Sequence, residues 1–374
     1  MNKTQFGPLM SRRNFLKVTG AVGVTAIGGH LLTTYAPWLD DEAQAALTRQ
    51  PLAQEQIMSQ QILEMVRYAT LAANGHNTQP WKFAVCQDVV EIPPDYSRRL
   101  PVVDPHDREL WISLGCALEN LLLAARAAGY AADVAYPNED DLIRVQLAPD
   151  APQASPLFDA IPLRQTTRSV YDGRPVPVAD LDSLQSLPQA AGVSLRLLTA
   201  PAEMETALAY VNAGNLRQYA DRAFVDELID WLRFNKQEAL GTLDGLYARC
   251  SGNPAVPRWV GQMFVGGTKP QQQADADAAK LRSSAGAVVI ATDADDSAAW
   301  VRAGQLYERL TLQMTAMNIK SALLNQPIEV AALRSQFQGA LGLNAAQPQL
   351  LVRFGYANPL PRSLRRPVQQ VLLT

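Results

Sequence analysis

The sequence predicts a protein of mixed α and β structure, with two related modules in one chain of 374 residues. The main observation is an internal repeat, in which residues 103–130 match residues 292–319 at a constant offset and without a gap. Each copy has apolar residues at helical spacing and leads to a strand-like run, at 142–147 and 349–354. The identical pairs are Asp104 and Asp293, Asp107 and Asp296, Trp111 and Trp300, Gly115 and Gly304, Glu119 and Glu308, Leu121 and Leu310, Leu123 and Leu312, and Ala127 and Ala316.

Chance similarity between two amphipathic helices is the alternative to a true repeat. A helical period requires apolar residues on one face, but it does not require the same Trp, Gly and Glu at fixed spacing. These shared residues therefore favour a duplication.

Further expected elements complete the two modules, which we place at residues 46–155 and 156–374. Apolar periodicity predicts a helix and a strand hairpin in the first module, and a matching helix and strand in the second. The predicted ranges are a helix over 56–72, strands over 82–86 and 89–92, a helix over 179–189 and a strand over 193–198.

The second module also holds a large insertion at about residues 201–280. Its early part has a helical pattern, strongest over 223–240, whereas residues 241–270 are rich in Gly and Pro. This later part keeps three aromatic residues, Tyr247, Trp259 and Phe264. Two interpretations stay open: a lid over a flat ligand, or a surface excursion that packs its own aromatic residues.

The first 45 residues have the pattern of an export signal. Ser11-Arg12-Arg13-Asn14-Phe15-Leu16-Lys17 matches the twin-arginine signal, and Ala43-Gln44-Ala45 is a small-x-small cleavage site. An uncleaved membrane anchor is the alternative, but the glycines and threonines between these motifs make a poor spanning helix. The pattern predicts folding in the cytoplasm and export by the twin-arginine machinery to a periplasmic or extracellular location.

Composition argues against several functional classes. With 48% hydrophobic and 18% charged residues, the chain is typical of a globular protein. A net charge of −3 gives no basic surface for nucleic acid. No stretch after the signal is apolar enough to predict a stable membrane span.

Cysteines and histidines predict neither a disulfide framework nor a metal site. The three cysteines are widely spaced, and Cys86 and Cys116 lie in apolar runs where we expect buried side chains. Only His76 and His106 lie beyond the signal. Carboxylates surround His106, but Asp-Pro-His-Asp is more typical of a loop that leads into a helix.

Two segments far apart in the chain carry residues suited to one ligand. The first, from Gly75 to Trp81, has the sequence Gly-His-Asn-Thr-Gln-Pro-Trp, and the second is Arg164-Gln165-Thr166-Thr167-Arg168. Near the C-terminus, Arg353-Phe354-Gly355-Tyr356 and Ser363-Leu364-Arg365-Arg366-Pro367 add further positive charge.

Together these segments resemble the FMN-dependent nitroreductase family, and most of all its Acg-like branch, in which two family modules are fused in one chain. The resemblance covers most of the chain after residue 45. It implies an α+β fold of nitroreductase type that forms an intramolecular pseudo-dimer. It also implies FMN as the cofactor, because the family uses an Asn-x-Gln-Pro-Trp loop and an Arg-x-Ser/Thr-x-Arg/Lys segment to bind it.

The resemblance assigns roles residue by residue. Arg164, Thr166 and Arg168 would bind the dianionic phosphate by charge-assisted hydrogen bonds, with Arg365 and Arg366 completing that pocket. The polar edge of the flavin or its ribityl chain would meet amide side chains of the Asn-x-Gln-Pro loop, and a glycine there allows close approach. A backbone amide near flavin N5 is expected from the segment around residue 326. The full set is Asn74, Gly75, Asn77, Gln79, Arg164, Thr166, Arg168, Gln326, Arg365 and Arg366.

Each segment also has an ordinary interpretation on its own. Arg164 and Arg168 could begin a solvated helix, Arg365-Arg366 could be a basic tail, and residues 77–80 could be a plain turn. Their joint order, with the repeat between them, favours the flavin site.

The implied function is an oxidoreductase that reduces a small organic acceptor, such as a nitroaromatic or quinone-like compound. No catalytic side chain is assigned, because flavin N5 supplies the chemistry. Two alternatives stay open. One is a protein that sequesters FMN under a lid with little or no turnover, and the other is an interaction protein that keeps the fold without flavin.

One FMN per chain is expected, because the two halves of the site are divided between the modules. The first module carries the Asn77–Pro80 loop but has only Pro51-Leu52-Ala53-Gln54-Glu55 where the arginines should precede its helix. The second carries Arg164–Arg168 but has Pro188-Gln189-Ala190-Ala191-Gly192 in place of the loop. The chain is thus expected to be a monomer that acts as a pseudo-dimer with one composite site.

Overall fold

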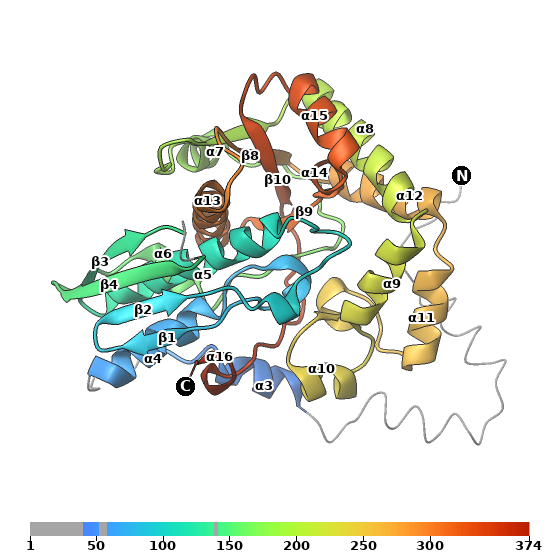
Figure 1. Ribbon diagram of the computed structural model, residues 1–374. Helices are drawn as coiled ribbons and strands as arrows, with labels where there is room; N and C mark the ends of the chain where they lie inside the picture. Colours follow the sequence, from blue (N-terminus) through green and yellow to red (C-terminus); the bar gives the residue numbers. More distant parts are fainter. Residues whose placement is uncertain (1–39, 52–57, 138–140, 374) are drawn as a thin grey trace, which may run out of the picture.

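A computed structural model describes residues 40–51, 58–137 and 141–373 (Figure 1). The twin-arginine segment at residues 11–17 lies outside the described residues. Two four-stranded sheets flank a central pair of long helices, α5 (Arg108–Ala127) and α13 (Ser297–Ala316). One continuous apolar core joins these helices to both sheets. This α+β architecture is the predicted one.

Both sheets are antiparallel and have equivalent strand orders, β1-β2-β4-β3 and β5-β8-β10-β9. In each module the two central strands flank the long helix in the chain, as a duplication requires. The repeat is therefore confirmed, although the edge strands β3 and β9 were not anticipated. The strands are β1 (Ala84–Cys86), β2 (Val89–Ile92), β3 (Tyr130–Ala135), β4 (Ile143–Pro149), β5 (Val193–Leu198), β8 (Gly286–Thr292), β9 (Lys320–Leu323) and β10 (Gln347–Gly355).

The two long helices cross through a reciprocal glycine contact. A Cβ atom on Gly115 would lie 2.0 Å from the carbonyl oxygen of Val301, and one on Gly304 would lie 2.0 Å from that of Ile112. Because these four residues form two equivalent pairs in the repeat, the contact has the self-complementary form of a two-fold dimer interface. The glycines are shared because any side chain would force the helices apart.

Shorter helices complete the modules. The C-terminal segment returns from the second module to the first, where Phe83 N donates to Val371 O (2.8 Å) and Leu373 N donates to Phe83 O (2.8 Å). This return brings the basic residues at 365 and 366 to the loop at 74–79. The remaining elements outside the insertion are α3 (Asp41–Leu47), α4 (Met58–Ala69), η1 (Gly75–Asn77), η2 (Tyr96–Arg98), α6 (Pro156–Ala160), α7 (Val178–Gln185), α14 (Gln326–Glu329), α15 (Ala331–Ala340) and α16 (Val368–Val371).

The insertion occupies the connection between β5 and β8, where the first module has only a tight turn at residues 87–88. Its two outer helices, α8 and α12, pack with α14 and α15 over the outer face of the second sheet. We call the part between them, residues 222–266, the lid; it has a small apolar core of its own. The insertion contains α8 (Pro201–Gln218), α9 (Arg222–Trp231), β6 (Leu232–Arg233), α10 (Lys236–Thr242), β7 (Leu246–Tyr247), η3 (Ala248–Ser251), α11 (Arg258–Gly266) and α12 (Pro270–Arg282).

Several local expectations were wrong. The helix predicted over 223–240 is broken at 232–235, because the side chain of Asn235 accepts a hydrogen bond from Glu238 N and begins α10 there. The helix predicted to reach residue 189 ends at Gln185, since Pro188 follows. The Gly- and Pro-rich stretch contains α11. Cys86 is exposed at the end of β1, whereas Cys116 is buried as expected.

Among the described residues, α5 is the one helix that is long and apolar enough to cross a membrane, so the expectation that no stretch after the signal is this apolar was wrong. Most of it is buried in the core, between the two sheets. Its apolar composition is thus explained by its central position.

Candidate functional site

Asn77 joins three segments that are far apart in the chain. Its Oδ1 accepts a hydrogen bond from Arg365 Nη1 (2.6 Å), and its Nδ2 donates to the carbonyl oxygens of Gly245 (3.1 Å) and Leu364 (3.3 Å). The loop, the lid and the C-terminal segment therefore meet at this one amide.

The backbone of this loop is strained. His76, Asn77 and Gln79 have φ angles of 48°, 55° and 54°, in the left-handed region that non-glycine residues rarely adopt. Each such residue costs about 1–2 kcal/mol. Clustered strain of this kind is typical of functional sites, where surrounding contacts hold the backbone in place.

A cavity of about 60 Å³, which we call the cationic cavity, lies beside this loop. It brings together most of the predicted ligands from both modules, and the lid and the C-terminal segment contribute Tyr247, Cys250, Ser251 and Ser363. The predicted residues on its wall are Asn74, Asn77, Arg164, Thr166, Arg168 and Arg365.

Positive charge exceeds negative charge around the cationic cavity. Arg164 pairs with Glu308 (Nε to Oε1, 3.0 Å), whose side chain has no exposed surface. Arg365 is held instead by neutral carbonyl oxygens, including that of Thr70 (2.9 Å). Burial lowers the pKa of Arg365 well below its usual value, and the positive charges of Arg49 and Arg164 lower it further. Bound negative charge would relieve this repulsion.

Arg168 and Thr166 have side chains with unused hydrogen-bonding capacity. Neither side chain has a hydrogen bond or ion pair with any residue in the described ranges, and both line the cationic cavity. Burial lowers the pKa of Arg168. Nearby, burial and then the charge of Arg168 lower the pKa of His76 to about 4, so His76 is neutral at pH 7.

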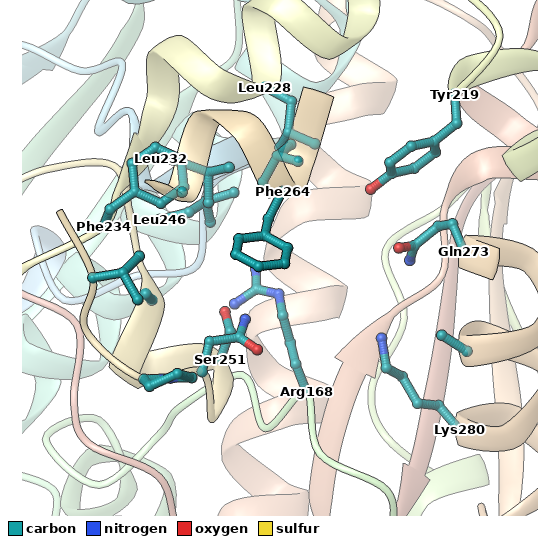
Figure 2. A pocket seen from close by; sticks show the side chains of 17 residues that line it. Arg168, Tyr219, Leu228, Leu232, Phe234, Leu246, Ser251, Phe264, Gln273 and Lys280 are labelled. Carbon is teal, nitrogen blue, oxygen red and sulfur yellow. The ribbon is translucent and has the colours of Figure 1, made fainter. Parts of the chain in front are cut away.

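A second, larger cavity of about 200 Å³ lies under the lid, and we call it the lid cavity (Figure 2). It shares Arg168, Leu246 and Ser251 with the cationic cavity, so the two are adjacent. Apolar side chains from the lid form one side, and polar side chains from Tyr219, Gln273 and Lys280 form the other. The labelled apolar residues are Leu228, Leu232, Phe234, Leu246 and Phe264.

Comparison with known proteins identifies the family. No family profile matches the chain. "Putative NAD(P)H nitroreductase Rv3131" of Mycobacterium tuberculosis is 31% identical over 317 residues, which cover 81% of this chain and 88% of the relative. The chain belongs to this nitroreductase family. "Putative NAD(P)H nitroreductase acg" of the same organism is 26% identical over 322 residues, or 83% of this chain and 94% of the relative.

Solved nitroreductases overlap part of the chain more loosely. The FMN and NADPH-dependent nitroreductase NfnB from Sphigopyxis sp. strain HMH is 15% identical to this chain, with a TM-score of 0.38. The superposed region covers 58% of this chain and 98% of the NfnB chain. A nitroreductase with bound FMN from Desulfitobacterium hafniense is 12% identical, covers 59% of this chain and 99% of its own, and has a TM-score of 0.37.

In this chain, two of the predicted ligands, Gln79 and Arg366, bind each other outside the cationic cavity. Gln79 has no exposed surface; its Nε2 donates to Leu243 O (2.8 Å), and its Oε1 accepts from Arg366 N (2.8 Å). Arg366 Nη2 donates in turn to Gln79 O (2.6 Å). These residues tie the loop to the lid and the C-terminal segment.

Gly75 and Gln326 also lie off the cationic cavity. Gly75 N donates to Ser113 Oγ (3.2 Å) beside a separate small cavity, and a Cβ atom there would make ordinary contacts. Gln326, at the start of α14, donates to Asn215 Oδ1 of α8 (3.3 Å) and to Asp277 Oδ2 of α12 (3.1 Å). The structure does not bring Gln326 to the cavity wall.

Asp41 of α3, which the sequence analysis missed, binds three side chains of the lid. Asp41 is 6% exposed and accepts from Tyr247 OH (3.1 Å), Arg249 Nη1 (2.9 Å) and Lys236 Nζ (3.3 Å). Burial opposes the charged carboxylate, but Arg249, Lys236 and Tyr247 outweigh it and lower the pKa of Asp41. The aromatic pattern had identified Tyr247, but nothing local in the sequence connects it with residue 41.

The aromatic residues of the lid divide between positions on a cavity wall and outer positions. Tyr247 lines the cationic cavity, and Phe264 lines the lid cavity while also packing against the small core of the lid. Trp259, on α11, is 49% exposed. The insertion therefore packs some of its own aromatic residues, and its role as a lid over a flat ligand stays a prediction.

The repeat creates a second centre at Glu119, the equivalent of Glu308. Here Arg309 Nε and Nη2 donate to the two oxygens of Glu119 (2.8 and 2.9 Å), and Arg309 Nη1 donates to Pro188 O (2.6 Å). Arg309 is the repeat equivalent of Asn120, which lies against Glu308 at the first centre. The guanidinium therefore occupies the space beside Glu119, and we call this the filled centre.

Proposed function

We propose that this protein binds one FMN between its modules and uses it as an oxidoreductase on a small organic acceptor. The observation that carries the proposal is the guanidinium of Arg168 beside Thr166, which has no hydrogen bond or ion pair within the described residues and lies in a cavity with excess positive charge. A dianionic phosphate suits such a pocket, because charge-assisted hydrogen bonds to it are strong. The relatives named as NAD(P)H nitroreductases support NAD(P)H as the electron donor.

Arg164, Thr166, Arg168 and Arg365 would hold the phosphate, and Asn74 would face the rest of the cofactor. Asn77 would act by fixing the loop, since its amide is already bound by protein groups on both sides. Bound FMN would supply hydride transfer, while the protein supplies position and electrostatics. Gln326 stays a prediction from the resemblance.

A second candidate function is flavin sequestration, which the closed lid favours. The lid is tied to the loop through Asn77 and Gln79, and to α3 through Asp41. Such ties would slow FMN release, because they must break before the lid opens. Anaerobic addition of NADPH to the purified yellow protein separates the two. Bleaching supports the enzyme, a stable yellow colour supports storage, and a colourless protein contradicts both.

The proposal predicts one FMN per polypeptide, because the filled centre lacks an Arg-x-Thr-x-Arg segment and Arg309 also occupies the space beside Glu119. The measurement is FMN released by heat, quantified by fluorescence against protein concentration. Two flavins per chain would contradict the split site, and half a flavin would indicate a site shared between two chains. Arg309→Asn is the informative variant. It should still bind one FMN, because the filled centre lacks the Arg-x-Thr-x-Arg segment.

A further inference from the structure

The lid cavity has two chemically different sides (Figure 2). On one side, Leu228, Leu232 and Phe264 present apolar surface from the lid. On the other, the hydroxyl of Tyr219 and the ammonium of Lys280 point toward the same space. A ligand that fills it needs a flat apolar body and an edge that accepts hydrogen bonds.

Lys280 is fixed in position by a buried carboxylate. Its Nζ donates to Asp277 Oδ1 at 2.8 Å, while Asp277 Oδ2 accepts from Asn215 (3.0 Å) and Gln273 (3.0 Å). The amides spread the negative charge of Asp277, and the ammonium keeps two protons for another partner. The ammonium of Lys280 is thus positioned to donate a hydrogen bond to an anionic group in the cavity.

Two other polar groups on the wall lack partners. Asn253 Oδ1 is buried without a hydrogen bond in the described part of the chain. The hydroxyl of Tyr219 likewise has no hydrogen bond with a described residue, and burial followed by the charges of Asp277 and Glu329 raises its pKa. The Tyr219 hydroxyl can donate to an acceptor atom of a ligand, whereas Asn253 Oδ1 accepts and needs a donor.

The lid cavity adjoins the cationic cavity but reaches different residues. All of its lining residues come from the second module, between residues 168 and 280, whereas Asn74 and Asn77 of the first module line the cationic cavity. The shared residues Arg168, Leu246 and Ser251 make the two cavities neighbours, so a molecule in the lid cavity would lie beside bound FMN. We propose that the lid cavity binds the electron acceptor and selects flat aromatic acids, with Lys280 contacting the carboxylate; this rests on the proposed function.

Isothermal titration of the FMN-loaded chain with 4-nitrobenzoate and the neutral 4-nitrobenzamide tests the proposal. The acid should bind once per chain and at least about tenfold more tightly, since hydrogen bonds to charged groups are the stronger ones. Equal binding of acid and amide, or no binding of either, would overturn it. Retention of FMN is measured first by absorbance, so loss of the cofactor would count against the proposed function and not against this inference.

Variants identify the residues responsible. Lys280→Met should weaken binding of the acid about tenfold and leave binding of the amide unchanged. Lys269→Met, at the exposed start of α12, is the charge-matched control and should leave both unchanged. Phe264→Leu should weaken both ligands equally, by a few-fold, because it removes flat apolar contact.

Competition decides which molecule the lid cavity holds. Independent binding of FMN and 4-nitrobenzoate supports an acceptor site, whereas mutual displacement would assign the cavity to the flavin ring and overturn the inference. If Lys280→Met does not fold by circular dichroism, Tyr219→Phe provides the second test. It should weaken binding of the acid several-fold, and an unchanged affinity would contradict the proposal.

Discussion

The two centres created by the repeat each contain a buried glutamate at an equivalent position, but the surroundings of the two glutamates differ. Glu308 pairs with Arg164 from a distant segment and has Asn120 beside it, next to a cavity with unneutralised arginines. Glu119 pairs with Arg309, which stands where the first centre has asparagine. The difference teaches that a duplicated scaffold can keep a buried glutamate paired with an arginine at both centres while a cavity lies beside only one of the two.

The two sheets also differ, in how far their strands are buried. Residues of the central strand β4 alternate between buried and exposed over most of its length, so that sheet keeps one face in water. In the equivalent strand β10 every residue after the first is buried, because α8, α12 and their neighbours cover the outer face of the second sheet. The insertion thus leaves the central strands of the second sheet buried on both faces. It also contributes the lid residues that line both cavities.

Removing each arginine partner should produce the largest difference between the centres. Arg164→Met leaves Glu308 buried and unpaired, which should cost about 3–5 kcal/mol of unfolding free energy. Arg309→Met should cost about 1–3 kcal/mol, because the Arg309 side chain is 23% exposed against 5% for Arg164. Urea unfolding of the FMN-free chain measures both. Equal losses would mean that the centres are not energetically distinct.

Reversing the charge at Arg168 should separate binding from folding. Arg168→Glu places a like charge against the phosphate and should lower FMN affinity at least about 100-fold, or about 3 kcal/mol. Unfolding of the FMN-free variant should change by less than about 1 kcal/mol, because Arg168 has no partner among the described residues. Fluorescence titration measures the affinity, with the exposed Arg174→Glu as control. Wild-type affinity would show that Arg168 does not contact the phosphate.

The smallest expected effect is on the titration of His76. The pKa of His76 is lowered to about 4 by burial and by Arg168, so the unfolded chain takes up this proton first. The contribution of His76 to stability is therefore lost as pH falls from about 6.5 toward 4. Arg168→Met should raise this pKa, as NMR titration of the imidazole would show. No change would mean that the two side chains do not interact.

Much of the fold follows from local patterns, because helical and alternating periodicity and the repeat are local signals. The break at 232–235 was also legible in principle, since Asn235-Lys236-Gln237-Glu238 is a helix-start pattern in which Phe234 N donates to Glu238 Oε2 (3.1 Å). The pairing of Phe83 with the C-terminal segment was not, because it joins residues nearly 290 positions apart in sequence.

The candidate site was predicted less completely, and amide residues explain why. Asn77 and Gln79 were assigned the same role. Asn77 lines the cationic cavity, whereas the side chain of Gln79 is hydrogen-bonded to Leu243 and Arg366. An amide can bind a ligand or a backbone group equally well, so its role depends on which group lies closest. Arg164 and Arg168 do line the cavity as predicted, whereas Arg366 is bound by the backbone oxygen of Gln79 instead.

The position of α3 has a consequence for maturation of the chain. The predicted cleavage motif Ala43-Gln44-Ala45 lies within this helix, and Ala45 is 3% exposed. A cut after Ala45 would remove Asp41 and leave the cations and hydroxyl of the lid without their carboxylate. The site of processing would then set how long a bound molecule stays inside. N-terminal sequencing of exported protein, together with its FMN release rate beside that of Asp41→Asn, tests this link. Equal release rates for Asp41→Asn and the wild type would break it.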